Sequence, residues 1–385
     1  MPTAGGPNTL GESNLVFAYD TGDTRNSYIG EPTTNQYTNP DFTNGTTGWT
    51  FGSWDGNVTY TTEAVTGPFG KTINALKLTK NATSAYSHFH QYNSGKYTTG
   101  NQYTLSAWVK GTGTFRGNTQ WGGIVQSFTL TGDWQYVQYT VTAPNNDNFP
   151  YWAAEALTTG TVFYMVYAQS EQKSHATPFV NGTRSVTQGL LPLVGNSTLD
   201  LTNVSFDSNA QMVFDGTNDR IDLGSDITIS QANQGWTAEY VFKTNSASTL
   251  QHFNSAEADD FNANWLAILG GKMAVWNVSP GYWKFGSTVF NSNQYYHIAF
   301  IQDAGGTNMR FYVNGVAEGG DHVGNVWTAA FSALKTRYIG QYEYAGSYSR
   351  YFTGEIPLTK MYNRALTAQE VKQNYQQYKT RFNLS

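Results

Sequence analysis

The hydrophobic pattern of this chain repeats every two residues, and this period limits the fold more than any other feature. Tyr103–Val109, Trp134–Val141 and Met309–Val313 alternate between apolar and polar side chains, as half-buried strands do. Thr161–Ala168 is apolar on both faces, which is expected of a strand covered by a second sheet. Asn314-Gly315 indicates a type I′ hairpin, because that turn needs two residues with positive φ. The pattern predicts an all-β fold of two antiparallel β-sandwiches of the jelly-roll type.

Length and charge narrow the classes of protein. With 385 residues the chain is long enough for two domains. Charged residues make up 13% of it and the net charge is −5, so clustered Lys and Arg for a nucleic-acid partner are not expected. Cysteine is absent, which excludes disulfides and thiolate sites. We expect no signal peptide and no membrane insertion, because neither a basic leader nor a run of about 18 apolar residues is found.

One short helix is expected at the C-terminus. Thr367 and Glu370 have the spacing of a capping box, in which each side chain binds the backbone amide of the other residue. Val371, Tyr375 and Tyr378 then fall on one face of the helix. The expected role of this helix is to close a sandwich.

Five segments in the second half of the chain resemble the laminin-G/pentraxin-like branch of the concanavalin A-like lectin/glucanase family. They occur in the order of that family, and the resemblance covers about residues 199–385. The segments are Met212–Gly224, Trp236–Phe242, Tyr296–Phe300, Phe311–Gly315 and Phe352–Ile356, the last leading into Met361–Val371.

The first half resembles a different sandwich, the galactose-binding-like carbohydrate-binding modules that are common in phage tail and fibre proteins. This resemblance covers about residues 36–180. Its segments are Thr38–Trp49, Tyr103–Val109, Gly132–Tyr136, Ala168–Glu171 and Ala176–Val180.

The N-terminal segment suggests that one domain is inserted into the other. Asn14–Asp20 is similar to the first strand of lectin-like domains in phage proteins, where it runs on to a segment like Leu190–Leu201. We therefore expect residues 1–35 and 181–385 to form one discontinuous lectin-like sandwich, with 36–180 inserted as the second. Such insertions are tolerated where the termini of the inserted domain lie close together. The alternative is two consecutive domains preceded by an N-terminal arm.

The sequence does not predict an enzyme. Glucanases of the resembled fold use closely spaced acids on one strand, and the nearest local match is Glu257–Asp260. That segment lacks strand alternation and a second Glu, so a solvated loop is expected. Motifs of serine hydrolases, zinc peptidases and phosphate-binding loops are also missing.

Two groups of residues are weighed as metal ligands. His88 and His90 would share one face of a strand, but no third ligand is evident, and a polar strand face is the simpler interpretation. Four oxygen-bearing residues could hold calcium, although the same residues also make turns. These are Asp215, Asn218, Asp219 and Asp222. Calcium is the one cofactor that we consider.

Aromatic side chains are the candidate sugar contacts, because the C–H face of a pyranose packs on an exposed ring. In the first half the candidates are Trp49, Trp54, Trp121 and Trp152. In the second half the candidates are Trp265, Trp276, Trp283 and Trp327, together with Tyr342 and Tyr344 of the loop 341–348. The alternative for each of them is a place in the core.

Taken together, the two resemblances and the ion-poor composition lead us to expect a non-enzymatic virion protein, of a tailed bacteriophage, that serves as a capsid decoration, fibre or adhesin. Its expected partners are other virion proteins and cell-surface polysaccharide, bound weakly at each site and strengthened by many copies or a homo-oligomer. It would be made in the host cytoplasm and displayed on the virion surface. Two alternatives remain: a purely structural capsid or tail component, and a polysaccharide-degrading enzyme.

Overall fold

The computed structural model describes most of the chain. The described residues are 12–53, 58–81, 86–91, 95–119, 123–143, 150–155, 158–230, 232, 234–256, 265–277, 282–306, 308–319, 333–344 and 346–385. They form antiparallel sheets and one α-helix, which confirms the all-β class. No helix of this described part is long and apolar enough to cross a membrane.

The chain divides into two compact units, and the first is assembled from separated segments. Unit 1 consists of Met1–Glu31, Ser185–Asp207 and Gln211–Ser385. Unit 2 consists of Pro32–Arg184 and Ser208–Ala210. The main chain thus passes between units after residues 31 and 184, where the sequence suggested 35 and 180.

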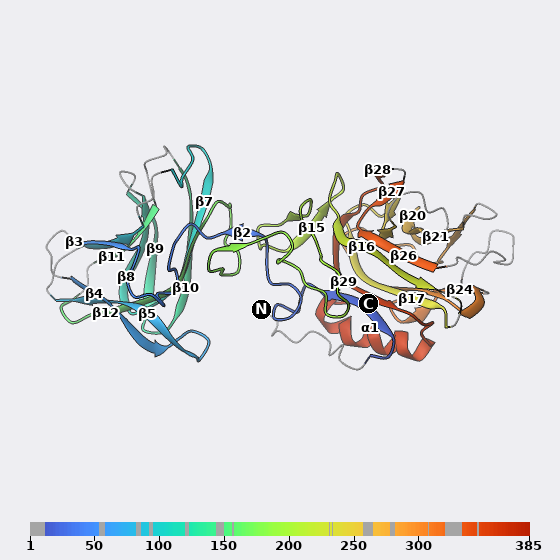
Figure 1. The fold of residues 1–385 in the computed structure, drawn as a ribbon, viewed down its shortest axis with the longest axis horizontal. Helices are drawn as coiled ribbons and strands as arrows, with labels where there is room; N and C mark the ends of the chain where they lie inside the picture. Colours follow the sequence, from blue (N-terminus) through green and yellow to red (C-terminus); the bar gives the residue numbers. More distant parts are fainter. Residues whose placement is uncertain are drawn as a thin grey trace. The chain divides into compact units, whose positions relative to one another are not determined.

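Unit 2 contains two five-stranded sheets and a small ribbon (Figure 1). The first sheet has the order β10 (Gln135–Thr142), β7 (Gln102–Lys110), β12 (Val162–Glu171), β5 (Thr72–Lys80) and β4 (Val58–Thr66). The second has the order β3 (Thr50–Ser53), β6 (Tyr86–His90), β11 (Pro150–Glu155), β8 (Thr112–Thr119) and β9 (Gly123–Thr131). The ribbon pairs β2 (Thr33–Thr34) with β13 (Thr183–Arg184).

The core of unit 2 lies between its two five-stranded sheets. Leu105 and Val109 project inward from β7, as their alternation predicts, and share a buried cluster with Phe115 and Trp152 of the opposite sheet. The rings of Phe115 and Trp152 are stacked, with centroids 5.4 Å apart.

Unit 1 is built on an eight-stranded sheet. Its order is β14 (Ser205–Phe206), β15 (Met212–Asp215), β29 (Thr353–Tyr362), β17 (Trp236–Thr244), β23 (Tyr295–Gln302), β24 (Met309–Val313) and β25 (Val316–Ala317), and β1 (Leu15–Asp20) also pairs with β29. In Figure 1 the N-terminal strand β1 is blue and is part of this C-terminal sheet. The expected hairpin at Asn314-Gly315 joins β24 to β25, with φ of 49° and 76°.

Three smaller sheets complete unit 1. One has the order β16 (Ile221–Ser230), β26 (Ala333–Ile339) and β19 (Asn254–Ser255). Another has the order β18 (Gln251–His252), β20 (Trp265–Leu269), β21 (Lys272–Asn277) and β22 (Tyr282–Phe285). The third is a hairpin of β27 (Tyr342–Tyr344) and β28 (Ser347–Ser349).

The two faces of the eight-stranded sheet are covered differently. Trp236 and Phe242 project from β17 into the main core, together with Leu266 of β20 and Val275 of β21. Val241 projects to the opposite face and packs against the C-terminal helix. Because both faces are covered, β17 is buried along almost its whole length.

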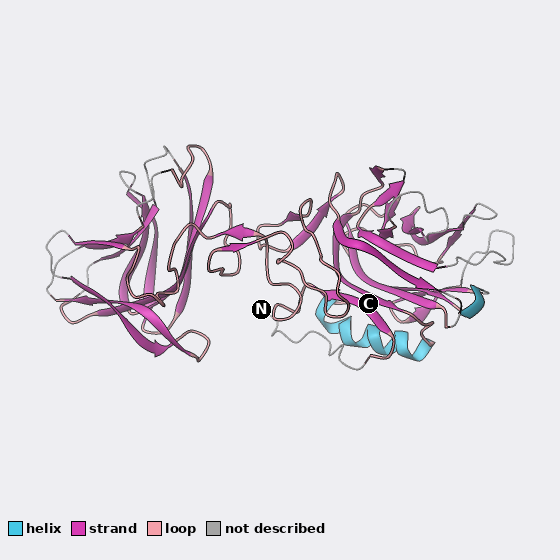
Figure 2. Ribbon diagram, viewed as in Figure 1, coloured by secondary structure: helices cyan, strands magenta, loops and turns pink. Residues whose placement is uncertain are grey.

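Helical structure in the described residues is confined to unit 1 (Figure 2). It comprises the short 3-10 turn η1 (Ala304–Gly306) and the helix α1 (Ala368–Phe382). The capping box is confirmed: the Thr367 hydroxyl accepts the Glu370 amide at 3.3 Å, and the Glu370 carboxylate accepts the Thr367 amide at 2.8 Å. Tyr375 and Tyr378 of α1 pack on the sheet, as their spacing predicts.

Candidate functional site

Two of the tryptophans proposed as sugar contacts in unit 2 are core residues, which corrects the prediction. Trp152 is fully buried, and Trp49 is 7% exposed. Trp49 stacks on Phe42 with centroids 5.1 Å apart, and its indole nitrogen donates to a backbone carbonyl. Neither ring offers a face to a ligand. Four further sites fall outside the described residues: Trp54, Trp121, Trp327 and Glu257–Asp260.

The four residues considered for calcium do not converge on a cation. The buried Asp219 carboxylate accepts the amide of Asp215 at 2.7 Å, and Asp215 itself accepts the amide of Thr217. Asp222 forms an ion pair with Arg337 at 2.8 Å, and Asn218 is exposed. The aspartate oxygens stabilise turns and an ion pair instead, so the four residues do not form the calcium site considered from the sequence. No cluster of three or more acidic or histidine ligands occurs among the described residues.

His88 and His90 do share a strand face, with ring centroids 5.7 Å apart. Burial lowers the pKa of His90 to about 4, and the neighbouring His88 acts in the same direction. Both rings are therefore neutral near pH 7. The described residues add no third ligand to the pair.

In unit 1, strand pairing brings three tryptophans into one row. Trp265 of β20 lies opposite Trp276 of β21, and Trp276 lies opposite Trp283 of β22. Because residues directly opposite each other in an antiparallel sheet share a face, all three indoles project to the side away from Leu266 and Val275, which enter the core. The centroids are 5.8 Å apart for the first pair and 5.3 Å for the second. All three indoles are half-buried.

The hairpin of β27 and β28 extends this row. Tyr342 packs edge-on against Trp265, with centroids 4.9 Å apart. Tyr344 is 40% exposed and lies parallel to Tyr342 at 6.4 Å. The sequence analysis predicted all five of these residues as sugar contacts, and the fold brings them together: Trp265, Trp276, Trp283, Tyr342 and Tyr344.

Two polar residues complete the set, and the sequence analysis missed both. His252 of β18 is fully buried, with its ring 4.8 Å from that of Tyr342. Arg350 follows β28, and its guanidinium carbon lies 4.5 Å from the centroid of Tyr342 and 5.8 Å from that of Trp265. No local motif marks either residue. We call the seven residues the aromatic surface: His252, Trp265, Trp276, Trp283, Tyr342, Tyr344 and Arg350.

Several buried polar atoms at and beside the aromatic surface have no hydrogen-bond partner. Both ring nitrogens of His252 and the Nη1 atom of Arg350 belong to this group. Gln341, which precedes β27, and Glu343 also have unpartnered side-chain atoms, but the side chain of Glu343 alternates to the opposite face of β27 from Tyr342 and Tyr344. A buried polar group without a partner costs about 1–3 kcal/mol, so such groups favour a molecule that supplies one.

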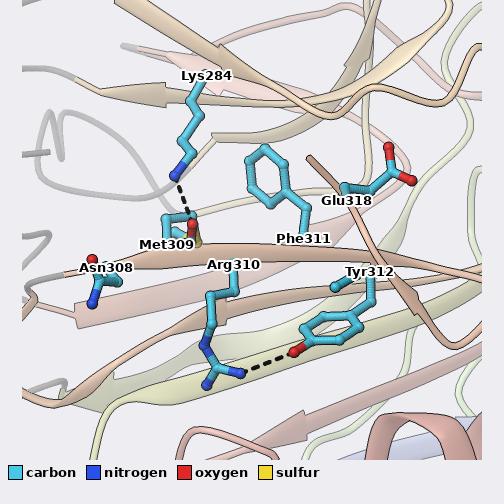
Figure 3. Close-up of a pocket in the computed structure, with 8 residues that line it drawn as sticks. Lys284, Asn308, Met309, Arg310, Phe311, Tyr312 and Glu318 are labelled. Atoms are coloured by element: carbon cyan, nitrogen blue, oxygen red, sulfur yellow. Dashed lines mark hydrogen bonds between the residues drawn. The ribbon is translucent and has the colours of Figure 1, made fainter. Parts of the chain in front are cut away.

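A separate cavity of about 260 Å³ lies where β22 meets β24 and β25 (Figure 3). Lys284 reaches across it and donates to the Met309 carbonyl at 2.6 Å, and burial lowers the pKa of this lysine to about 8. Arg310 projects to the other side of β24 and pairs with Asp303 at 2.6 Å. The Glu318 carboxylate accepts amides and hydroxyls from the segment after β22. These polar groups brace the β24–β25 hairpin and are already engaged, which makes the aromatic surface the stronger candidate.

Unit 1 thus combines a two-layered antiparallel sandwich with an aromatic surface on one of its smaller sheets. Residues 215–372 match the family described as the concanavalin A-like lectin/glucanases superfamily. This match confirms the resemblance of the second half of the chain to the concanavalin A-like family. The likeness of residues 36–180 to galactose-binding-like modules remains a prediction.

Several solved structures match parts of the chain at low sequence identity. The CBM40 module of the Ruminococcus gnavus IT-sialidase, bound to α2,3-sialyllactose, is 13% identical and aligns over 41% of this chain and 96% of its own, with a TM-score of 0.31. The heptameric SAP-like pentraxin of Limulus polyphemus is 18% identical over 42% and 78%, also at 0.31. The C-terminal family 22 carbohydrate binding module of Clostridium thermocellum Xyn10B is 18% identical over 37% and 94%, at 0.30. No curated protein sequence matches the chain.

Proposed function

We propose that this chain is a non-enzymatic carbohydrate-binding protein and that the aromatic surface of unit 1 holds the sugar. The observation that carries the proposal is the continuous row of rings from Trp283 to Tyr344, in which the three tryptophans are half-buried, Tyr344 is exposed and the buried Tyr342 joins them. Unpartnered polar atoms of His252 and Arg350 border this row. Rings of this kind accept the apolar C–H face of a pyranose, and the polar atoms pair with its hydroxyls. Both activities in the name of the matching family, lectin and glucanase, are directed at sugars.

Binding rather than hydrolysis is proposed because hydrolysis of a glycosidic bond requires two carboxyl groups facing one another. In the described part of the aromatic surface, the neighbouring carboxylate is Glu343. Its side chain alternates to the opposite face from Tyr342 and Tyr344, and one of its oxygens accepts the Gly346 amide at 2.6 Å. Release of reducing sugar from a bound polysaccharide would contradict this part of the proposal.

The test is binding of the full chain, displayed on a multivalent scaffold, to a glycan array. Trp276→Ala combined with Trp283→Ala should abolish the signal, because two stacking faces are lost. Trp134→Ala is the matched control, since this half-buried tryptophan lies in unit 2. Undiminished binding by the double variant would refute the assignment of the site.

We further propose that the protein is displayed in many copies on the surface of a bacteriophage virion as a decoration, fibre or adhesin protein. The phage-type resemblance of residues 14–20 and 36–180 supports this setting, and weak single sites then gain strength through avidity. Mass spectrometry of purified particles, followed by antibody labelling of intact ones, tests it. Absence of the chain from the particles would exclude the proposal.

One observation favours the alternative of a structural component. Unit 2 carries a second group of contiguous rings, which we call the aromatic patch: Phe69, Trp108, Tyr136, Tyr167 and Phe179. Phe69 is 66% exposed and Tyr136 is 45% exposed, and a contiguous exposed apolar group is typical of a protein interface. Analytical ultracentrifugation of Phe69→Ser tests whether the chain assembles through this patch. Ile124→Ser is the control, because Ile124 is exposed but is not part of the patch. Loss of an oligomer in the first variant alone would support the alternative.

A further inference from the structure

We propose that the aromatic surface selects acidic polysaccharides, because Arg350 is placed to pair with a carboxylate of the bound sugar. This inference rests on the proposed function of the same surface. A lectin-like fold does not by itself specify the class of glycan. The inference specifies it from the charge and contacts of Arg350.

Among the described residues, Arg350 lacks the acidic partner that four other arginines of unit 1 have. Each of those four arginines contacts a carboxylate. The pairs are Arg310 with Asp303, Arg337 with Asp222, Arg364 with Glu370 and Arg381 with Asp20. Among the residues that the structure describes, Arg350 forms no ion pair, and its Nη1 atom is buried without a hydrogen bond. A guanidinium so placed favours an anion from outside the chain.

The contacts of Arg350 are compatible with pairing to a carboxylate. Its guanidinium carbon lies 4.5 Å from the centroid of the Tyr342 ring and 5.8 Å from that of the Trp265 ring, both cation–π contacts. A cation–π contact does not use the N–H groups as hydrogen-bond donors to a carboxylate, which can accept two of them from an arginine. The residue also has a φ of 52°, which is uncommon for a side chain of this size, and its carbonyl accepts the His252 amide at 3.1 Å. The backbone therefore holds Arg350 against the rings.

Among the described residues, no carboxylate pairs with Arg350. His252, the other ionisable residue beneath Tyr342, stays neutral near pH 7 because its pKa is low. Glu343 projects to the other face of β27, and one of its oxygens is held by the Gly346 amide. The whole chain has a net charge of −5, so attraction of an acidic glycan depends on this local cation. Because Nη1 is covered, pairing requires rotation of the guanidinium about its terminal bonds.

The experiment compares two forms of one polysaccharide. Oligogalacturonate and its carboxyl-reduced, neutral form are titrated into the full chain by calorimetry, at low and high salt. We expect the acidic form to bind about 10- to 100-fold more tightly at low salt, and the difference to shrink as salt screens the pair. Arg350→Gln should remove that preference, so that the acidic and neutral forms bind this variant with equal affinity, and Arg350→Lys should retain part of it.

The controls separate this inference from the proposed function. Arg25→Gln removes the same charge from an exposed position of unit 1 and should leave the preference intact. Equal thermal unfolding of Arg350→Gln and the parent shows that the fold is unchanged. Equal binding of acidic and neutral forms by the parent would overturn selection by Arg350 but leave sugar binding in place. Tighter binding of a sulfated dextran than of oligogalacturonate would overturn the choice of carboxylate, and binding of no glycan by the multivalent chain would overturn the proposed function itself.

Discussion

Asp20 and Arg381 are 361 residues apart in the sequence and form a two-armed ion pair, with nitrogen–oxygen distances of 2.5 and 2.7 Å. Asp20 ends β1 and is buried, whereas Arg381 lies in the last turn of α1. The pair connects the first strand of unit 1 to its last helix. The N-terminal segment is thereby an integral part of a unit whose other residues follow unit 2 in the chain.

Arg381→Gln should destabilise unit 1 by about 3 kcal/mol, because it leaves the buried Asp20 carboxylate without its cation. Chemical denaturation, followed by the tryptophan fluorescence of unit 1, measures the effect. Arg381→Lys should retain part of the stability, since a lysine ammonium keeps the positive charge but replaces the two guanidinium nitrogens that bind Asp20. A change below about 0.5 kcal/mol would show that the pair is no more than a surface contact.

Deletion of residues 32–184, with a short linker joining Glu31 to Ser185, should leave a folded unit 1. The strand pairs of β1 with β29, and the bridges of Tyr28 with Leu190 and Ala18 with Val194, all lie within that unit. Deletion of residues 12–31 should instead leave unit 1 without a stable fold and therefore without a cooperative unfolding transition, because β29 loses its paired neighbour β1. Calorimetry distinguishes the results. If the second deletion melts like the parent chain, β1 is a dispensable arm.

Trp152→Ala and Trp276→Ala should affect different properties. Trp152 is fully buried, so its truncation should cost unit 2 about 3–5 kcal/mol and leave sugar binding by unit 1 unchanged. Trp276 is half-buried on the aromatic surface, and its truncation should cost about 1 kcal/mol or less of stability while weakening binding. Thermal unfolding and calorimetric titration of both variants check the contrast. The reverse pattern would move the sugar site to unit 2.

Acid should destabilise unit 1 through His252. Burial lowers the pKa of this residue from 6.5 to about 3, and the charge of Arg350 acts in the same direction. Below about pH 6.5 the unfolded chain takes up a proton there that the folded protein does not. The free energy of unfolding that depends on the neutral His252 is therefore fully present above about pH 6.5. It is lost as the pH falls toward 3, at up to about 1.4 kcal/mol per pH unit.

His252→Gln should flatten this dependence, because glutamine does not titrate. Denaturation of both proteins near pH 7 and near pH 5 measures the two slopes, and His175→Gln, a substitution in unit 2, serves as the control. Equal slopes for the parent and His252→Gln would mean that the imidazole has the same pKa in the folded and the unfolded protein, and would contradict the prediction.

Local patterns in the sequence determined the strands, the Asn314-Gly315 turn and the capping box at Thr367. Each depends on residues that are neighbours in the chain, and the physical causes are backbone sterics, alternation of side chains and hydrogen bonds within one turn. The segments typical of the concanavalin A-like family added the topology of unit 1. Strand periodicity by itself does not say which sheet covers which face.

Only the tertiary structure decided which aromatic rings are available to a ligand. Trp152 and Trp276 both lie in strands, yet the first enters a core and the second faces away from one. The difference arises because a strand face is buried or exposed according to what packs on it, and the packing partner comes from elsewhere in the chain. His252 and Arg350 meet Tyr342 through the pairing of separate hairpins. Such a meeting depends on long-range register, which no local pattern in the sequence encodes.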